Sequence, residues 1–248
     1  MTSLYGAPGE LLLILLVLGH LIGDFAFRSE GMVKGKRPDR YLIRHIGLIL
    51  GAHLLLLAPL LTWGVAGIVG GVAVLHGLID LVKASGESGR RTGLQAFLID
   101  QAAHLVTLLV AWAFVVHWVG VPAVRWSEPA LGWFVTGAMI LGVFAFNATG
   151  GAALVHGVLA MRGSGLEEDE GLAGSGRLIG ILERTLSLVL ILVGQWAALA
   201  ILIGAKSIAR FDELKDRQFS EYYLIGTLTS LLVAVLNGLI LSALLAWR

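Results

Sequence analysis

The chain has 248 residues, of which 57% are hydrophobic and 14% are charged, and its formal net charge is +1. A soluble domain of this length needs more polar surface, so the composition excludes that class and predicts a multi-pass helical membrane protein. The sequence has no cysteine, which excludes disulfide bonds and thiolate metal ligands.

The first half of the chain has four apolar runs long enough to cross a bilayer. No basic segment precedes the first run and no small-residue cleavage pattern follows it, so we expect a retained helix and not a signal peptide. The loop after this run carries the densest basic cluster, which predicts that the loop is cytoplasmic and the N-terminus outside. The four spans are predicted at residues 10–27, 41–59, 63–82 and 92–118.

The second half is harder to assign. An apolar run over 130–161 is interrupted by Asn147–Gly151, which indicates either one tilted or kinked helix or a span followed by a half-helix. Residues 162–176 are acidic and glycine-rich and predict a loop. Two more spans are expected, at 178–205 and 222–247.

We therefore predict an all-α transmembrane bundle of about seven spans. Its expected domains are a four-helix His/Asp site domain over residues 1–120 and a C-terminal transmembrane helical domain over 121–248. Seven simple crossings would place the basic residues of 206–217 outside, against the charge rule, so the topology of the second half stays open.

Ionisable residues recur within the first four runs at one spacing. Three His/Asp pairs are separated by four positions, so the two members of each pair share one face of a helix. A further histidine opens the second run. Judged from the two basic loops, all of them lie in the cytoplasmic half of the membrane, within about two or three helical turns in height. They are His20, Asp24, His45, His76, Asp80, Asp100 and His104.

Ionisable groups inside a membrane are costly and usually functional, so we predict that these seven residues form a metal site between four helices. The alternative is a set of Asp–imidazole hydrogen bonds that hold the helices together. Three such pairs at one level would leave too many desolvated acids to be stable without a cation. The remaining intramembrane histidines (His53, His117 and His156) are expected to be helix–helix hydrogen-bond partners.

Imidazole and carboxylate ligands together suit zinc first, with manganese or iron as alternatives. Seven ligands exceed one tetrahedral zinc site. They fit either two metals or one metal whose histidines are oriented by further Asp residues, and both arrangements stay open.

In the second half, Glu183 and Arg184 are expected to form either a buried ion pair or an interfacial pair at a helix start. A second hypothesis is an anion site at a helix end, formed by Lys206, Arg210 and Glu221.

The order of these motifs resembles a bacterial membrane family catalogued as domain of unknown function 3307. The matching residues are His20, Asp24, Phe25, His45, His76, Asp80, Lys83, Asp100, Gln101 and His104. The runs 176–184, 205–211 and 221–227 are similar to the C-terminal half of longer members. The resemblance implies a multi-pass protein of the bacterial inner (cytoplasmic) membrane. It implies no established activity, so it supports the choice of residues and leaves the reaction open.

The first functional hypothesis is a metal-dependent hydrolase that acts on a lipid-linked ester or phosphoester at the cytoplasmic leaflet. Asp80 and Asp100 are its candidate catalytic residues, because a carboxylate near the metal can accept a proton from water. Lys83 and Arg210 are candidates to bind a substrate phosphate, although Lys83 also suits a lysine that reaches the membrane surface.

Two other functions fit the same residues. One is a transporter of a divalent metal ion or of protons, and the other is a structural scaffold whose metal holds the four helices together. The expected partner is membrane lipid, and a homo-oligomer is compatible with the sequence. No nucleic-acid partner is expected, because the basic loops lack interleaved aromatic residues.

Overall fold

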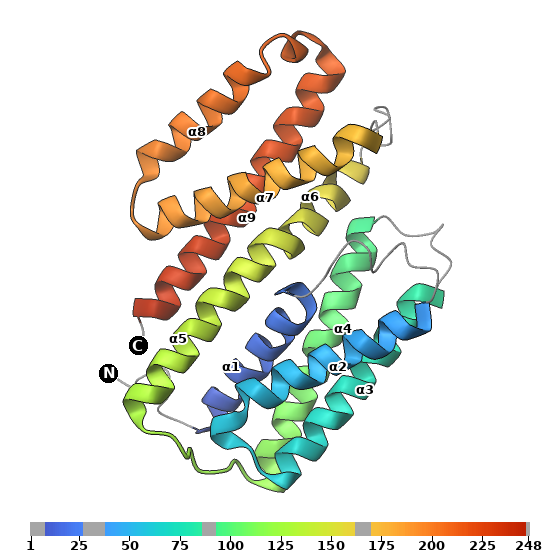
Figure 1. Cartoon of the computed structure of the whole chain (residues 1–248), viewed down its shortest axis with the longest axis vertical. Helices are drawn as coiled ribbons and strands as arrows, with labels where there is room; N and C mark the ends of the chain where they lie inside the picture. The colour runs from blue at the N-terminus through green and yellow to red at the C-terminus, as the bar shows by residue number, and fades with distance from the viewer. Residues whose placement is uncertain (1–7, 27–37, 86–92, 162–169, 247–248) are drawn as a thin grey trace. The chain divides into compact units, whose positions relative to one another are not determined.

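The computed structural model describes residues 8–26, 38–85, 93–161 and 170–246, and these ranges are helical with short connections and without a strand (Figure 1). The predicted all-α class is confirmed. Within the described residues, five helical runs are long and apolar enough to cross a membrane, and two shorter apolar helices cover Leu42–Leu56 and Trp196–Ala209. The five runs are Pro8–Ala26, Trp63–Lys83, Gly93–Val119, Glu128–Ala160 and Arg217–Ala246.

The described residues divide into two compact units. The first takes its residues from Met1–Gly89, Leu98–Phe146 and Leu245–Arg248, and the second from Arg90–Phe97 and Asn147–Leu244. Each unit is described by itself below.

The first unit is a helical bundle. Helix α1 (Pro8–Leu21) continues as the π-helical turn η1 (Ile22–Ala26), and both pack against α2 (Pro38–Leu56) and α5 (Glu128–Ala145). Helix α2 also packs along α3 (Trp63–Ser85) after the short 3₁₀ turn η3 (Ala58–Leu60). Helix α4 (Gly93–Phe114), which enters this unit at Leu98, ends in the π-helical turn η4 (Val115–Val119).

Leucines of α1 fill the centre of this bundle: Leu11, Leu12, Leu15 and Leu16 are at most 2% exposed. Large apolar side chains on the outer faces are exposed, among them Leu75, Val82, Val106 and Val110. An apolar interior with an apolar exterior is the arrangement expected of helices that face lipid, and it indicates a membrane protein.

The second unit begins within the π-helical turn η5 (Phe146–Gly150) and continues through α6 (Gly151–Ala160). Helix α7 (Glu170–Leu192) packs against α6 and against α8 (Trp196–Ala209), and the 3₁₀ turn η6 (Glu213–Lys215) leads to α9 (Arg217–Ala246). Residues 128–160 form one continuous helical run. The residues Asn147–Gly151, where the sequence indicated an interruption, lie in and directly after the π-helical turn at 146–150 and do not end the helix.

Two sequence expectations for this half are wrong. The predicted span over 178–205 is broken, because α7 ends at Leu192 and Gly194 adopts a φ of 73°. The amide of Gln195 donates to Leu190 O and that of Gly194 to Ile191 O, which is the Schellman pattern of a helix end. The predicted loop over 162–176 lies partly outside the described residues, and its part from residue 170 onward belongs to α7.

Candidate metal centre

The seven predicted ligands come from neighbouring elements of the first unit and meet at one level. His20 ends α1, Asp24 lies in η1 and His45 lies near the start of α2. His76 and Asp80 lie in the last turns of α3, and Asp100 and His104 in the early turns of α4. All of them are buried except Asp80, whose side chain is 22% exposed. The expected convergence of the four helices is therefore present in the structure.

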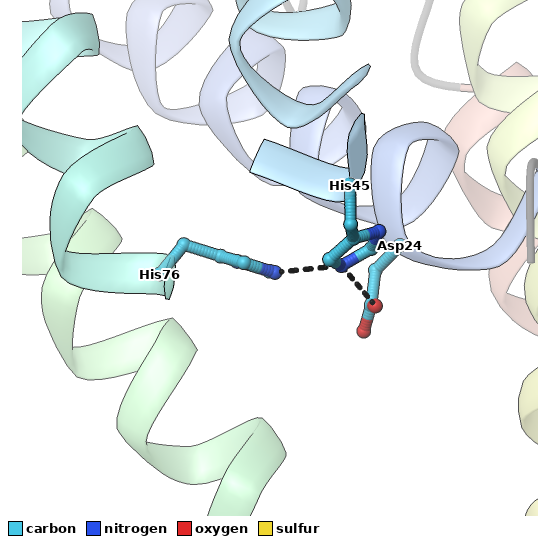
Figure 2. A group of neighbouring side chains, drawn as sticks. All are labelled: Asp24, His45 and His76. Carbon is cyan, nitrogen blue, oxygen red and sulfur yellow. Dashed lines mark hydrogen bonds and ion pairs between the residues drawn. The ribbon is translucent and has the colours of Figure 1, made fainter. Parts of the chain in front are cut away.

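Three of these side chains form a nearly equilateral triangle of ligand atoms. The Nε2 atoms of His45 and His76 are 3.2 Å apart, and Asp80 Oδ2 lies 3.5 Å from the first and 3.4 Å from the second. Asp24 Oδ1 approaches His45 Nε2 to 3.5 Å from the other side. Figure 2 shows His45 between His76 and Asp24, with all three side chains pointing into one space.

These separations match the edges of a metal coordination polyhedron. Ligand atoms at about 2.0–2.1 Å from one zinc ion, at tetrahedral angles, lie about 3.3–3.4 Å from one another. The atoms of Asp24, His45 and His76 all lie within 4.8 Å of one another, as do those of His76, Asp80 and His104. The donor set of imidazole and carboxylate therefore fits a divalent ion of the zinc type in both composition and spacing.

His104 and Asp100 contain buried polar atoms without a hydrogen-bond partner among the described residues. They are both ring nitrogens of His104 and Oδ1 of Asp100. The ring of His104 stacks on that of His76 with 3.9 Å between centroids, and the ring of His20 lies 5.0 Å from it. The ring also interacts with the backbone of His76, and its place beside the rings of His20 and His76 makes His104 a candidate metal ligand.

Gln101 connects residues from three helical segments. Its Oε1 accepts a hydrogen bond from His20 Nε2 at 3.2 Å, and its Nε2 donates to Oδ2 of Asp24 at 3.1 Å and of Asp100 at 3.3 Å. Sequence reasoning included Gln101 in the family resemblance but did not select it as a site residue. The available signal was its place one turn before His104, on the helix face that carries the ligands.

Lys83 is bonded inside the site. Its Nζ donates to Asp100 Oδ2 at 2.7 Å, with 35% of the lysine side chain exposed and 4% of the aspartate side chain. The ion pair gives Asp100 a cationic partner and leaves the ammonium within reach of solvent. The expected role of Lys83 toward a phosphate stays a prediction.

The backbone of α1 and η1 brings Asp24 to its neighbours. The chain widens from α-helical to π-helical pairing at Ile22–Ala26, a feature common near functional sites. Gly23 permits close contact with α2, since a Cβ at this position would lie 2.8 Å from Ile49 Cδ1 and 3.3 Å from Ile49 Cα. A small residue beside Asp24 therefore sets the distance between η1 and the helix that carries His45.

The other intramembrane histidines and Arg210 form no hydrogen bond or ion pair with the seven candidate ligands among the described residues. His53 Nδ1 donates to Ile49 O within its own helix at 2.9 Å, and its interaction with the backbone of Leu16 on α1 agrees with the expected helix–helix partner. His117 and His156 are exposed. Arg210 belongs to the second unit and lies 3.7 Å from Glu213, and its expected role toward a phosphate stays a prediction.

Two expectations for the second unit differ from the structure. Glu183 pairs with Lys206 at 2.6 Å and not with Arg184, so the predicted Glu183–Arg184 pair is wrong. The three residues of the predicted anion site, Lys206, Arg210 and Glu221, are paired with Glu183, Glu213 and Arg217 respectively.

Comparison with known proteins supports the predicted resemblance. Residues 12–127 match the model of a family described as a protein of unknown function (DUF3307), and this segment contains all seven candidate ligands and Gln101. No curated protein and no solved structure matches the chain.

Proposed function

We propose that this protein is a metal-dependent membrane hydrolase that acts on a lipid-linked ester or phosphoester at the cytoplasmic leaflet of a bacterial inner membrane. One divalent ion, zinc in the first instance and manganese or iron otherwise, is held by His45, His76, Asp80 and Asp24. His104 and His20 complete the surroundings of the ion.

The observation that carries the proposal is the triangle of His45, His76 and Asp80, with sides of 3.2, 3.4 and 3.5 Å. These three side chains come from two helices whose relative position is fixed by the packing of α2 on α3. Both groups of candidate ligands include His76, which favours one ion over two.

A divalent ion in this position would lower the pKa of a coordinated water toward about 7 and so supply a nucleophile at neutral pH. Asp100 Oδ1 is buried without a partner among the described residues, and it is the group we assign to accept the proton. Lys83 donates to Asp100 Oδ2 at 2.7 Å and presents its ammonium toward a substrate phosphate.

Access from one side favours a hydrolase over a transporter. Asp80 and Lys83 are partly exposed, with 22% and 35% of their side chains accessible, whereas the histidines are buried. Beyond the ligands along the helices, the buried residues are mainly apolar, with His53 as a polar exception; they include Leu16, Ile49, Val72 and Leu108. An ion would have to cross this apolar layer to leave by the other side.

Elemental analysis of the purified full-length protein tests the metal site first. We expect about one zinc, manganese or iron ion per chain, because the ligand triangle fits one ion. His76→Ala should lose most of the metal, and His156→Ala, which alters an exposed histidine outside the cluster, should retain it. Wild-type protein that takes up no divalent metal would contradict the proposal.

Turnover then separates the possible functions. With phospholipid and lipid-ester vesicles, Asp100→Asn should lower hydrolysis roughly 10²–10⁴-fold while the metal is retained. Metal-loaded protein that shows no hydrolysis would contradict the hydrolase. Metal uptake into proteoliposomes that is abolished by His76→Ala would assign a transporter instead. A protein that binds metal but shows neither hydrolysis nor metal uptake would be assigned to the structural scaffold.

A further inference from the structure

A second group of buried charges lies in the second unit, separate from the predicted ligands. Arg184 on α7 is 3% exposed, and its guanidinium donates to Asn147 O and Ala148 O at 3.0 Å each and to Ser230 Oγ at 3.4 Å. All three acceptors are neutral, and within the described ranges no carboxylate lies at ion-pair distance from Arg184. A buried guanidinium is costly, and Arg184 shares the one carboxylate that acts on its charge, that of Glu183, with Lys206.

The neighbouring carboxylate is already used. Glu183 contacts Lys206 Nζ at 2.6 Å, and their side chains are 19% and 25% exposed. The group of Arg184, Glu183 and Lys206 thus contains two cations and one carboxylate. The formal charge of these three side chains is therefore +1, and one of the two cations, Arg184, is buried.

A pocket lies beside this group, between α7, α8 and α9. Its interior has space for about one water-sized group, roughly 20 Å³, which is the size of a small ion or one phosphoryl oxygen. The pocket is lined by the Glu183–Lys206 pair, by three hydroxyl residues and by apolar residues: Glu183, Ser187, Leu202, Ile203, Lys206, Thr227, Ser230 and Leu231.

The hydroxyl groups of the pocket have hydrogen atoms to donate. Thr227 Oγ1 is buried and has no hydrogen-bond partner in the described part of the chain. Ser230 Oγ accepts a hydrogen bond from Arg184, so its own hydrogen remains for another acceptor. Buried donors of this kind are normally satisfied, and both residues line the pocket, which indicates a ligand that accepts hydrogen bonds.

We propose that this pocket binds an anion, bonded by the hydroxyls of Thr227 and Ser230 and attracted by Lys206 and Arg184. The shared chemistry is that of a chloride ion or a single phosphoryl oxygen, supplied by a free ion or by a lipid headgroup. A cation is disfavoured, because Glu183 and Lys206 pair with each other at 2.6 Å and Arg184 leaves the group with a net positive charge. The site is independent of the proposed hydrolase chemistry.

Thermal unfolding of the full-length protein in detergent tests the proposal. The midpoint should rise in a saturable way with sodium chloride or sodium phosphate relative to sodium gluconate, and choline chloride should act as sodium chloride does. Thr227→Val removes one hydroxyl at nearly constant shape and should require about tenfold more anion for the same shift. If Lys206→Gln fails to fold because it leaves Glu183 unpaired, Thr227→Val remains as the test.

Lys215→Gln is the matched control, since Lys215 forms a 2.7 Å pair with Asp212 on the exposed surface and should not alter the shift. In nanodiscs, stabilisation by phosphatidylglycerol over phosphatidylcholine, with no effect of free anions in detergent, would identify the source as the headgroup of an anionic lipid. A midpoint that follows sodium and not the anion would overturn the proposal. So would a midpoint that is equal in all salts and lipids, or a shift that Thr227→Val leaves unchanged.

Discussion

Gln101 holds two of the acids and one histidine of the first unit in register. One amide group bonds His20, Asp24 and Asp100, which come from α1, η1 and α4. An amide suits this position because it donates to two carboxylates with one end and accepts from an imidazole with the other. Groups that bond a metal's ligands fix the orientation of those ligands and commonly tune affinity.

We therefore expect Gln101→Ala to weaken zinc binding roughly 10–100-fold. The variant leaves His20 Nε2 and one oxygen each of Asp24 and Asp100 without the amide, while His45, His76 and Asp80 are unchanged. The measurement is a competition titration of zinc against a chelator with the purified protein. Gln195→Ala, in the exposed turn after α7, should bind zinc as the wild type does.

Gln101 acts as a positioning residue if affinity falls while the stoichiometry stays at about one ion per chain. Gln101→Asn, which keeps the amide on a shorter side chain, should recover part of the loss. Unchanged affinity in Gln101→Ala would mean that the amide serves helix packing alone.

At the scale of the elements, the first half of the chain was more predictable than the second. The predicted spans over 63–82 and 92–118 nearly coincide with the helical runs Trp63–Lys83 and Gly93–Val119. The i, i+4 spacing predicted that the two members of each His/Asp pair share one helix face. The positions of the basic loops predicted that all the pairs lie at a similar depth in the membrane. Together these two local patterns predicted that the ligands converge.

Hydrogen-bond partners were less predictable because they depend on contacts between distant segments. The pairing of Glu183 with Lys206 and the contacts of Gln101 with Asp24 involve residues far apart in the chain. The break at Gly194 has a local signal, a glycine at the C′ position of a Schellman motif. That signal was outweighed in the sequence by the apolar residues on both sides, which alone predict one continuous span.

The π-helical turn η1 carries its own prediction. Gly23→Ala adds a Cβ that would lie 2.8 Å from Ile49 Cδ1 and 3.3 Å from Ile49 Cα, so η1 and α2 must separate slightly. Because Asp24 and His45 lie on these two elements, we expect zinc affinity to fall about tenfold or more, as measured by the same competition titration. Gly51→Ala is the control on α2, since a Cβ there meets no atom within 4 Å. Equal affinities for Gly23→Ala and Gly51→Ala would show that this close contact does not set the site.

At the scale of the whole molecule, the matched family segment and the candidate metal centre coincide. Residues 12–127 include α2, α3 and α4 and most of α1. The second unit contains its own polar group around Arg184 and lies largely beyond that segment. The proposed metal centre therefore lies within the matched segment, and the proposed anion pocket lies outside it.

Metal removal tests how far the folded chain depends on the ion. A ligand that binds the native state alone stabilises it by RT ln(1 + [L]/Kd), or about 4 kcal/mol when the free metal is a thousand times the Kd. We therefore expect a chelator to lower the unfolding temperature of the wild type and readded zinc to restore it. His76→Ala should show neither effect, because it lacks a corner of the ligand triangle. A wild-type unfolding temperature unaffected by both chelator and added zinc would argue that the four helices are held by packing and hydrogen bonds, and that no ion resides between them.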